Sequence, residues 1–140
     1  MKAIKMVLCI GFTALLLCLC ACHAGNARDV DIQKVSSDMY SQQEIDDAIE
    51  VILEEFKFWQ GCTMTEICYA GDEVNKRENA YYIEGGVYDA DEMIVLDSSF
   101  DVDESGADMS LNPGTTYDHW SWMLVRTNGG TWKHVTHGYG

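Results

Sequence analysis

The stretch Tyr40–Gln60, YSQQEIDDAIEVILEEFKFWQ, predicts an amphipathic α-helix that begins at Ser41. Ser41 and Glu44 have the spacing of a capping box, in which a hydroxyl and a carboxylate satisfy free backbone N–H groups. Gly61 is a typical helix end. The acidic side chains of the stretch are typical of a solvated helix face. Apolar side chains recur every three or four residues and form one stripe: Ile45, Ala48, Ile49, Ile52, Phe56 and Trp59.

Downstream of this helix the pattern changes to strands. Thr63–Tyr69 has a β-leaning composition between two glycines, and Asp72 can cap a weaker helix that runs to about Tyr82. Met93–Val102 alternates between two faces, although Ser98 interrupts the apolar one. The apolar face holds Ile94, Leu96, Phe100 and Val102, and the polar face holds Asp97, Ser99, Asp101 and Asp103.

The last residues predict a β-hairpin. Two strands, His119–Thr127 and Thr131–Tyr139, flank Asn128-Gly129-Gly130, and Asn-Gly accommodates the positive φ angles of a tight turn. The register stays open. A two-residue loop would place Val125 opposite Trp132, and a three-residue loop would shift every pair by one.

These elements predict an α+β fold, with an amphipathic N-terminal helix packed on a curved antiparallel sheet of about four strands that ends in the hairpin. The domain spans residues 41–140. Residues 23–40 lack periodicity and are expected to be a flexible tether. Residues 1–22 have the features of an export signal.

The export signal predicts a lipid anchor. Lys2 and Lys5 precede the apolar run Met6–Ala21, which is shorter than the roughly 20 residues of a membrane span. Leu19-Cys20-Ala21-Cys22 resembles the lipobox of bacterial lipoproteins, so Cys22 is the expected attachment site for a diacylglyceryl group and a further acyl chain such as palmitate. Ordinary cleavage after Ala24 or Ala27, or an uncleaved anchor, are the alternatives.

The charge of the chain excludes one class of partner. It has 23 Asp and Glu against nine Lys and Arg, a formal net charge of -14 at pH 7. Loss of Lys2 and Lys5 with the signal brings the formal charge to about -16. Nucleic-acid binding needs basic surface, so no nucleic-acid partner is expected. The expected location is the extracytoplasmic face of the cell membrane. Because an anionic membrane surface repels an acidic domain, we expect the lipid to hold the domain at a distance from the surface.

Beyond Cys22, two cysteines remain, Cys62 and Cys68. If both lie on one strand, six residues separate them by roughly 20 Å, too far for a disulfide. Two partly buried thiols are therefore favoured, and a disulfide requires the segment to fold back.

Seven strings of the chain follow one another in a recognisable order: Tyr40–Ile45, Gly61–Thr63, Val95–Asp103, Ser110–Pro113, Trp122–Arg126, Gly129–Trp132 and His137–Tyr139. Together they resemble a family of small exported bacterial lipoprotein domains of unknown function. The resemblance covers about residues 40–140. It implies a cone-shaped α+β fold similar to the nuclear-transport-factor-two-like group, and it implies no activity, ligand or catalytic residue.

One loop has the spacing of a calcium site. Asp101, Asp103, Ser105 and Gly106 match the first half of a calcium-binding loop, and Asp108 adds a further carboxylate. Asn112 stands where such a loop has a bidentate Glu. The alternative is a turn whose side chains cap their own backbone.

The histidines are weaker candidates for chemistry. His134 and His137 suggest a pair of ligands, but three residues along a regular strand they are expected to face opposite sides. His119 follows Asp118, which could orient it. A hydrolase would need a nucleophile, a base and an orienting group within hydrogen-bond reach.

Four tryptophans could line a ligand pocket, although aromatic side chains also fill small cores. They are Trp59, Trp120, Trp122 and Trp132, with the first three the preferred candidates. Two hypotheses follow. The first is a non-catalytic, lipid-anchored domain that binds an envelope protein or a small ligand. The second is a secreted hydrolase that uses His119 or His137 with a carboxylate, which would have to lie within about 3.2 Å in a cleft.

Overall fold

Helix α1, Gln42–Phe56, begins at the predicted capping box: the Glu44 N–H donates to Ser41 Oγ, and the Ser41 N–H donates to the Glu44 carboxylate. The computed structural model describes residues 24–107 and 110–139. Every member of the predicted apolar stripe is buried, including Trp59 just beyond the helix. The helix therefore packs as its periodicity predicts.

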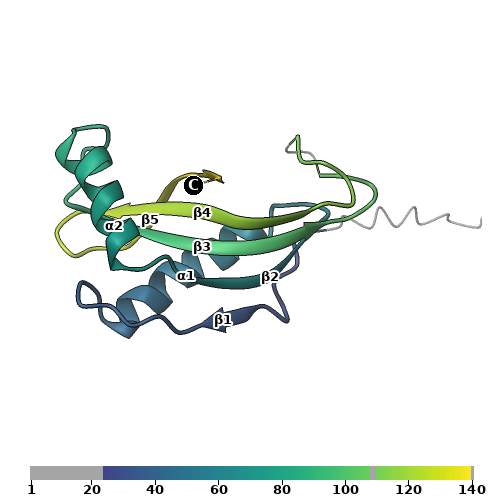
Figure 1. Ribbon diagram of the computed structural model, residues 1–140, viewed down its shortest axis with the longest axis horizontal. Coiled ribbons are helices and arrows are strands. Elements are labelled where there is room, and N and C mark those ends of the chain that lie inside the picture. The colour runs from purple at the N-terminus through teal and green to yellow at the C-terminus, as the bar shows by residue number, and fades with distance from the viewer. Residues whose placement is uncertain (1–23, 108–109, 140) are drawn as a thin grey trace, which may run out of the picture.

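A five-stranded mixed sheet provides the partner surface, so the α+β prediction is confirmed (Figure 1). The strands lie in chain order, and all neighbours are antiparallel except β1 and β2, which are parallel. Their bounds are β1 Asp31–Gln33, β2 Cys62–Tyr69, β3 Glu92–Val102, β4 Thr116–Arg126 and β5 Lys133–Tyr139.

The sheet differs from the expected antiparallel one of about four strands. The extra strand, β1, lies within residues 23–40, the segment expected to be a tether. All three of its residues are exposed, so no alternation of apolar and polar side chains marks it in the sequence. Backbone bonds add to this pairing, since the Asn26 N–H donates to Cys62 O and the Met64 N–H donates to Asn26 O.

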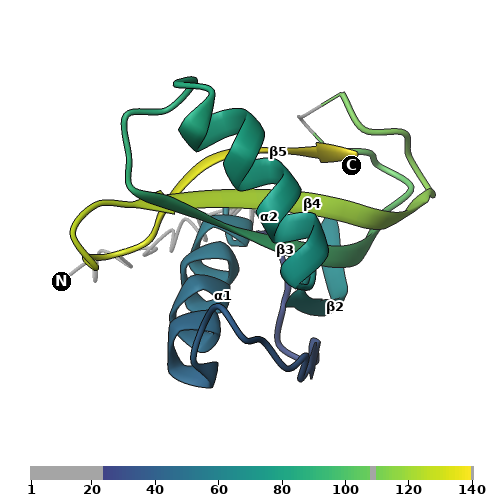
Figure 2. The same ribbon diagram turned by 60° about the vertical axis from the view of Figure 1, so that its left-hand side comes forward.

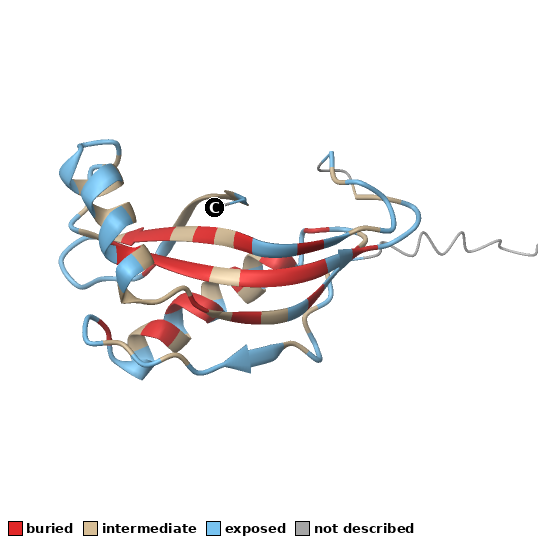
Figure 3. Cartoon of the chain, in the orientation of Figure 1, coloured by how far each residue is buried: buried red, intermediate tan, exposed pale blue. Residues whose placement is uncertain are grey.

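Helices cover both faces of the sheet (Figure 2). Helix α1 packs on one face over a large core that includes Phe56, Phe100 and Trp122. Helix α2, Asp72–Asn79, and a π-helical turn, Ala80–Glu84, cover a smaller core on the other face. Strand β3 is consequently buried along most of its length (Figure 3).

Helix α2 is attached to β3 by asparagine side chains. Strand β2 ends at Tyr69, opposite Leu96, and the Ala70 N–H just beyond it donates to Val95 O. Among the described residues, no strand pairs with the start of β3 on that side. The Asn75 amide fills the place: it donates to Met93 O at 2.9 Å, and its oxygen accepts the Val95 N–H at 2.8 Å. Asn79 pairs in the same way with Met93.

The C-terminal hairpin is confirmed, and its register is the three-residue alternative. Val125 pairs with Lys133, and Asn128 and Gly129 have φ angles of 55° and 63°. Further along, Leu124 pairs with His134 but Met123 pairs with Thr136, so Val135 is an extra residue in β5. This β-bulge decides how the histidines of β5 are arranged.

Candidate functional site

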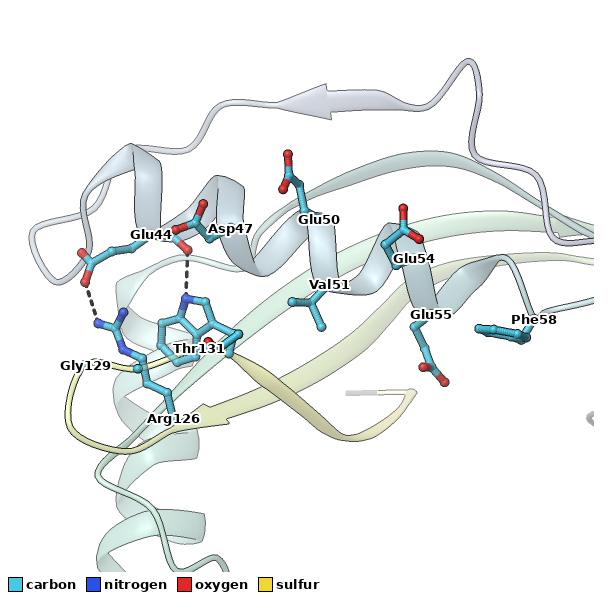
Figure 4. Close-up of a pocket in the computed structure, with 12 residues that line it drawn as sticks. Glu44, Asp47, Glu50, Val51, Glu54, Glu55, Phe58, Arg126, Gly129 and Thr131 are labelled. Carbon is cyan, nitrogen blue, oxygen red and sulfur yellow. Dashed lines mark hydrogen bonds and ion pairs between the residues drawn. The ribbon is translucent and has the colours of Figure 1, made fainter.

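A cleft of about 990 Å³ lies between α1 and the turn that leads into β5 (Figure 4). The acidic side chains of α1 form one wall, and the other wall comes from Arg126 and the turn before β5. The lining residues are Glu44, Asp47, Glu50, Val51, Glu54, Glu55, Phe58, Arg126, Gly129, Gly130, Thr131 and Trp132.

Among the described residues, Arg126 is the one cationic side chain that lines this cleft, and it is paired with carboxylates of the same chain. Its guanidinium bonds to Glu44 on α1 and to Glu92 on β3, and it lies 4.1 Å from the centroid of the Trp132 ring. The hydrogen bond from Arg126 is the main reason why the pKa of Glu44 lies below its usual value. The remaining carboxylates therefore leave the cleft strongly negative.

The cleft also has apolar surface. Phe58 is 79% exposed at one end, and Val51 and Trp132 contribute further apolar contact. The Trp132 indole N–H donates to the backbone oxygen of Glu44, which fixes the tryptophan against α1. Glu54 is paired with Lys57, but the carboxylates still outnumber the cations around the cleft. An exposed aromatic beside excess carboxylates is suited to a cationic ligand with an apolar stem.

The prediction that His134 and His137 face opposite sides of the strand is wrong. The bulge at Val135 turns both imidazoles to the same face, where His137 Nδ1 lies 3.3 Å from His134 Nε2. Both rings pack against Trp122, and burial lowers the pKa of both histidines. Alternation alone misses this arrangement, because a bulge breaks the two-residue period.

His119 lies on the opposite face, in a second cleft of about 530 Å³ that Cys68, Asp97 and Ser121 also line. Its Nδ1 is 3.5 Å from Asp97 Oδ1, beyond the 3.2 Å expected of a working pair, and its side chain is 88% exposed. Burial raises the pKa of Asp97 and of the Cys68 thiol, so Cys68 is not activated as a nucleophile.

Both cysteines of the domain are free thiols. Both lie in the single strand β2, which is the arrangement that the spacing argument favours. Burial raises the pKa of Cys62 to about 11. Neither thiol is therefore ionised at neutral pH.

The acidic loop forms the self-capped turn rather than a convergent ligand set. Asp103 Oδ1 accepts hydrogen bonds from the N–H and the hydroxyl of Ser105, while Asp101 accepts one from Thr116. Asp108 lies outside the described residues. Within residues 24–107 and 110–139, no group of three or more His, Cys, Asp or Glu side chains is placed to hold a metal ion. Calcium binding here stays a prediction.

Of the tryptophans expected to line a pocket, Trp132 lines the cleft, whereas Trp59, Trp120 and Trp122 lie in the core instead. Trp59 and Trp122 are packed with their rings 4.8 Å apart, and Trp122 is fully buried. The Trp122 indole donates to Ser98 Oγ at 2.8 Å, which explains the serine on the apolar face. The Trp120 indole N–H is buried and has no partner within the described part of the chain.

Cys22, the expected lipid site, lies outside the described residues. In the described part of the chain, no helix is both long enough and apolar enough to span a bilayer.

The acidic face of α1 is predicted from the sequence to be solvent-exposed surface, and the cleft that it lines is not predicted. The signal was the excess of carboxylates on one side of the helix, but the turn that faces them is far away in sequence. Comparisons with protein-family models, with curated proteins and with solved structures found no match for this chain.

Proposed function

We propose that this protein is a lipid-anchored, extracytoplasmic binding domain, and that its cleft between α1 and the β4–β5 turn binds a Lys- or Arg-rich segment of an envelope protein. The observation that carries the proposal is the composition of the cleft. Five carboxylates and an exposed phenylalanine line it, and its one arginine is paired internally.

The charge pattern favours a cationic peptide over a small neutral ligand. A Lys or Arg side chain brings a charged head for the carboxylates and a methylene stem for Phe58 and Val51. The net negative charge of the domain also attracts a basic partner over distance, which raises the association rate. A long acidic cleft therefore fits several basic side chains in a row.

The anchor and the fold family are part of the same proposal. The lipobox around Cys22 supports attachment to the membrane, and the strings quoted above support kinship with exported lipoprotein domains of the nuclear-transport-factor-two-like group. The hydrolase alternative draws on His119 and Asp97, whose 3.5 Å separation and exposed imidazole support it less than the cleft supports binding.

Replacement of Cys22 by Ala is expected to release the protein from membranes and to abolish incorporation of a labelled lipid precursor. Cys20→Ala is the matched control and should leave both unchanged, because Cys20 follows a leucine where the lipobox has a small residue. Membrane retention and labelling in Cys22→Ala would contradict the anchor.

The cleft is tested with a fluorescein-labelled octalysine peptide, whose anisotropy reports binding to the full chain in detergent. The triple variant Asp47→Asn, Glu50→Gln, Glu54→Gln removes three exposed charges of the cleft. It should weaken binding at least tenfold, and Phe58→Ala should weaken it without any change in charge.

The matched control for this test is Glu73→Gln, Glu84→Gln, Asp89→Asn, which removes three exposed charges outside the cleft. It should change the dissociation constant less than twofold. Equal weakening by both triple variants would show that the peptide responds only to the overall charge, and it would overturn the assignment of the cleft.

A further inference from the structure

The bulged strand β5 brings together three atoms that carry lone pairs. His134 Nε2 lies 3.3 Å from His137 Nδ1 and 3.2 Å from the backbone oxygen of Thr136. With a hydrogen on His134 Nε2, one N–H faces two acceptors. With the hydrogen on His137 Nδ1 instead, the lone pair of His134 Nε2 faces Thr136 O. The arrangement thus leaves more acceptors than donors at one point.

We propose that His134 and His137 bind a divalent first-row transition metal ion through these two nitrogens, with Thr136 O and water available to complete the coordination. Imidazole nitrogens suit zinc, nickel and copper, and histidine is the commonest metal ligand in proteins.

The spacing of the nitrogens matches a metal site. Two nitrogens bound at about 2.0–2.1 Å with tetrahedral geometry lie about 3.3 to 3.4 Å apart. The observed separation is 3.3 Å, which lies within that range. The aromatic packing of both rings on Trp122, and of His137 on Trp59, holds them in place before any ion binds.

The surroundings of the pair support the same assignment. The other ring nitrogen of His134, Nδ1, faces the Glu55 carboxylate at 3.9 Å. This is longer than a hydrogen bond, so Glu55 acts through its charge and would have to approach to orient the ring as carboxylates orient metal-bound imidazoles elsewhere. Glu55 also lines the acidic cleft, so negative charge that attracts a cation lies close to the pair.

The test uses Ni²⁺ and the intrinsic tryptophan fluorescence of the full chain. Ni²⁺ bound at the pair lies beside Trp59 and Trp122 and should quench their emission in a saturable way. His134→Gln and His137→Gln should each weaken this binding tenfold or more. The control His119→Gln, on an exposed histidine of another strand, should match the wild type. Zn²⁺ should reverse the quenching by competition, and Mg²⁺ should not.

Several outcomes would overturn the metal site. One is the absence of saturable quenching in the wild type, and another is equal quenching in all four proteins, which would place the ion on cysteines or elsewhere. If circular dichroism shows that His137→Gln does not fold, His134→Asn replaces it in the test, because the ring of His134 lies farther from Trp59. Wild-type affinity in that variant would also reject the site.

Discussion

Asn75 is a fully buried polar residue whose side chain hydrogen-bonds to the backbone of β3. Asn75→Ala would leave the Val95 N–H without its partner and remove a donor from Met93 O. A buried polar group without a partner costs about 1–3 kcal/mol. The variant should therefore lower the free energy of unfolding by about 2–3 kcal/mol in urea titrations.

Lys76→Ala is the control for this variant, since Lys76 is exposed on the same helix. It should stay within about 0.5 kcal/mol of the wild type. Equal stabilities of Asn75→Ala and Lys76→Ala would show that water replaces the amide without cost.

Glu44 is expected to make a stability contribution that depends on pH. Its pKa is lowered in the folded state, first by the hydrogen bond from Arg126 and then by the Ser41 backbone. A carboxyl with a lowered folded pKa stabilises the protein above its unfolded pKa, near 4.3, and loses this effect as the pH falls through the folded pKa. Glu44→Gln keeps a capping-box residue but loses the charge.

Glu44→Gln should therefore be less stable than the wild type by about 1 kcal/mol at pH 7, a value reduced for partial solvent exposure. The difference should shrink below about pH 4 as the wild-type carboxyl protonates. Urea titrations at both pH values measure it, with Glu50→Gln as the control. A difference that persists unchanged at low pH would contradict the charge argument.

At the scale of the element, the β4–β5 turn depends on one glycine. Gly129 has a φ of 63°, and a Cβ added there would meet nothing within 4 Å, so only the backbone opposes a larger residue. Gly129→Val should cost about 1 kcal/mol or more and lower the melting temperature by several degrees.

Asn128→Gly provides the opposite case, because Asn128 has a φ of 55° that glycine adopts freely. Its backbone N–H still donates to Asp91. This variant should melt at or above the wild-type temperature. A Gly129→Val protein that melts with the wild type would mean that the turn differs from the one described.

Elements with a local signal were predictable from the sequence, and elements defined by distant partners were not. The capping box and stripe predicted α1, and Asn-Gly predicted the hairpin. Strand β1 carries no alternation, because its three residues are all exposed. The bulge at Val135 depends on pairing with β4, so the contact between His134 and His137 could not be derived from their spacing.

At the scale of the whole molecule, the sequence predicted the core better than the site. The spacing of apolar residues indicates which side chains are buried, so the large core and the α+β class follow from the sequence pattern. The cleft needs α1 and a turn more than 70 residues later to lie side by side, and no periodicity records that distance. The tryptophans were misplaced for the same reason, since aromatic residues fill a core and line a pocket equally well.

The order of the strands has a consequence for folding. Each strand pairs with the strand that precedes it in the chain, so each step of assembly closes only the connection between sequence neighbours. Closing a shorter connection costs less chain entropy than closing a longer one, which favours this stepwise pairing of neighbours. If the chain is exported N-terminus first, as the proposed function requires, each strand would find the preceding strand already outside the membrane when it emerges.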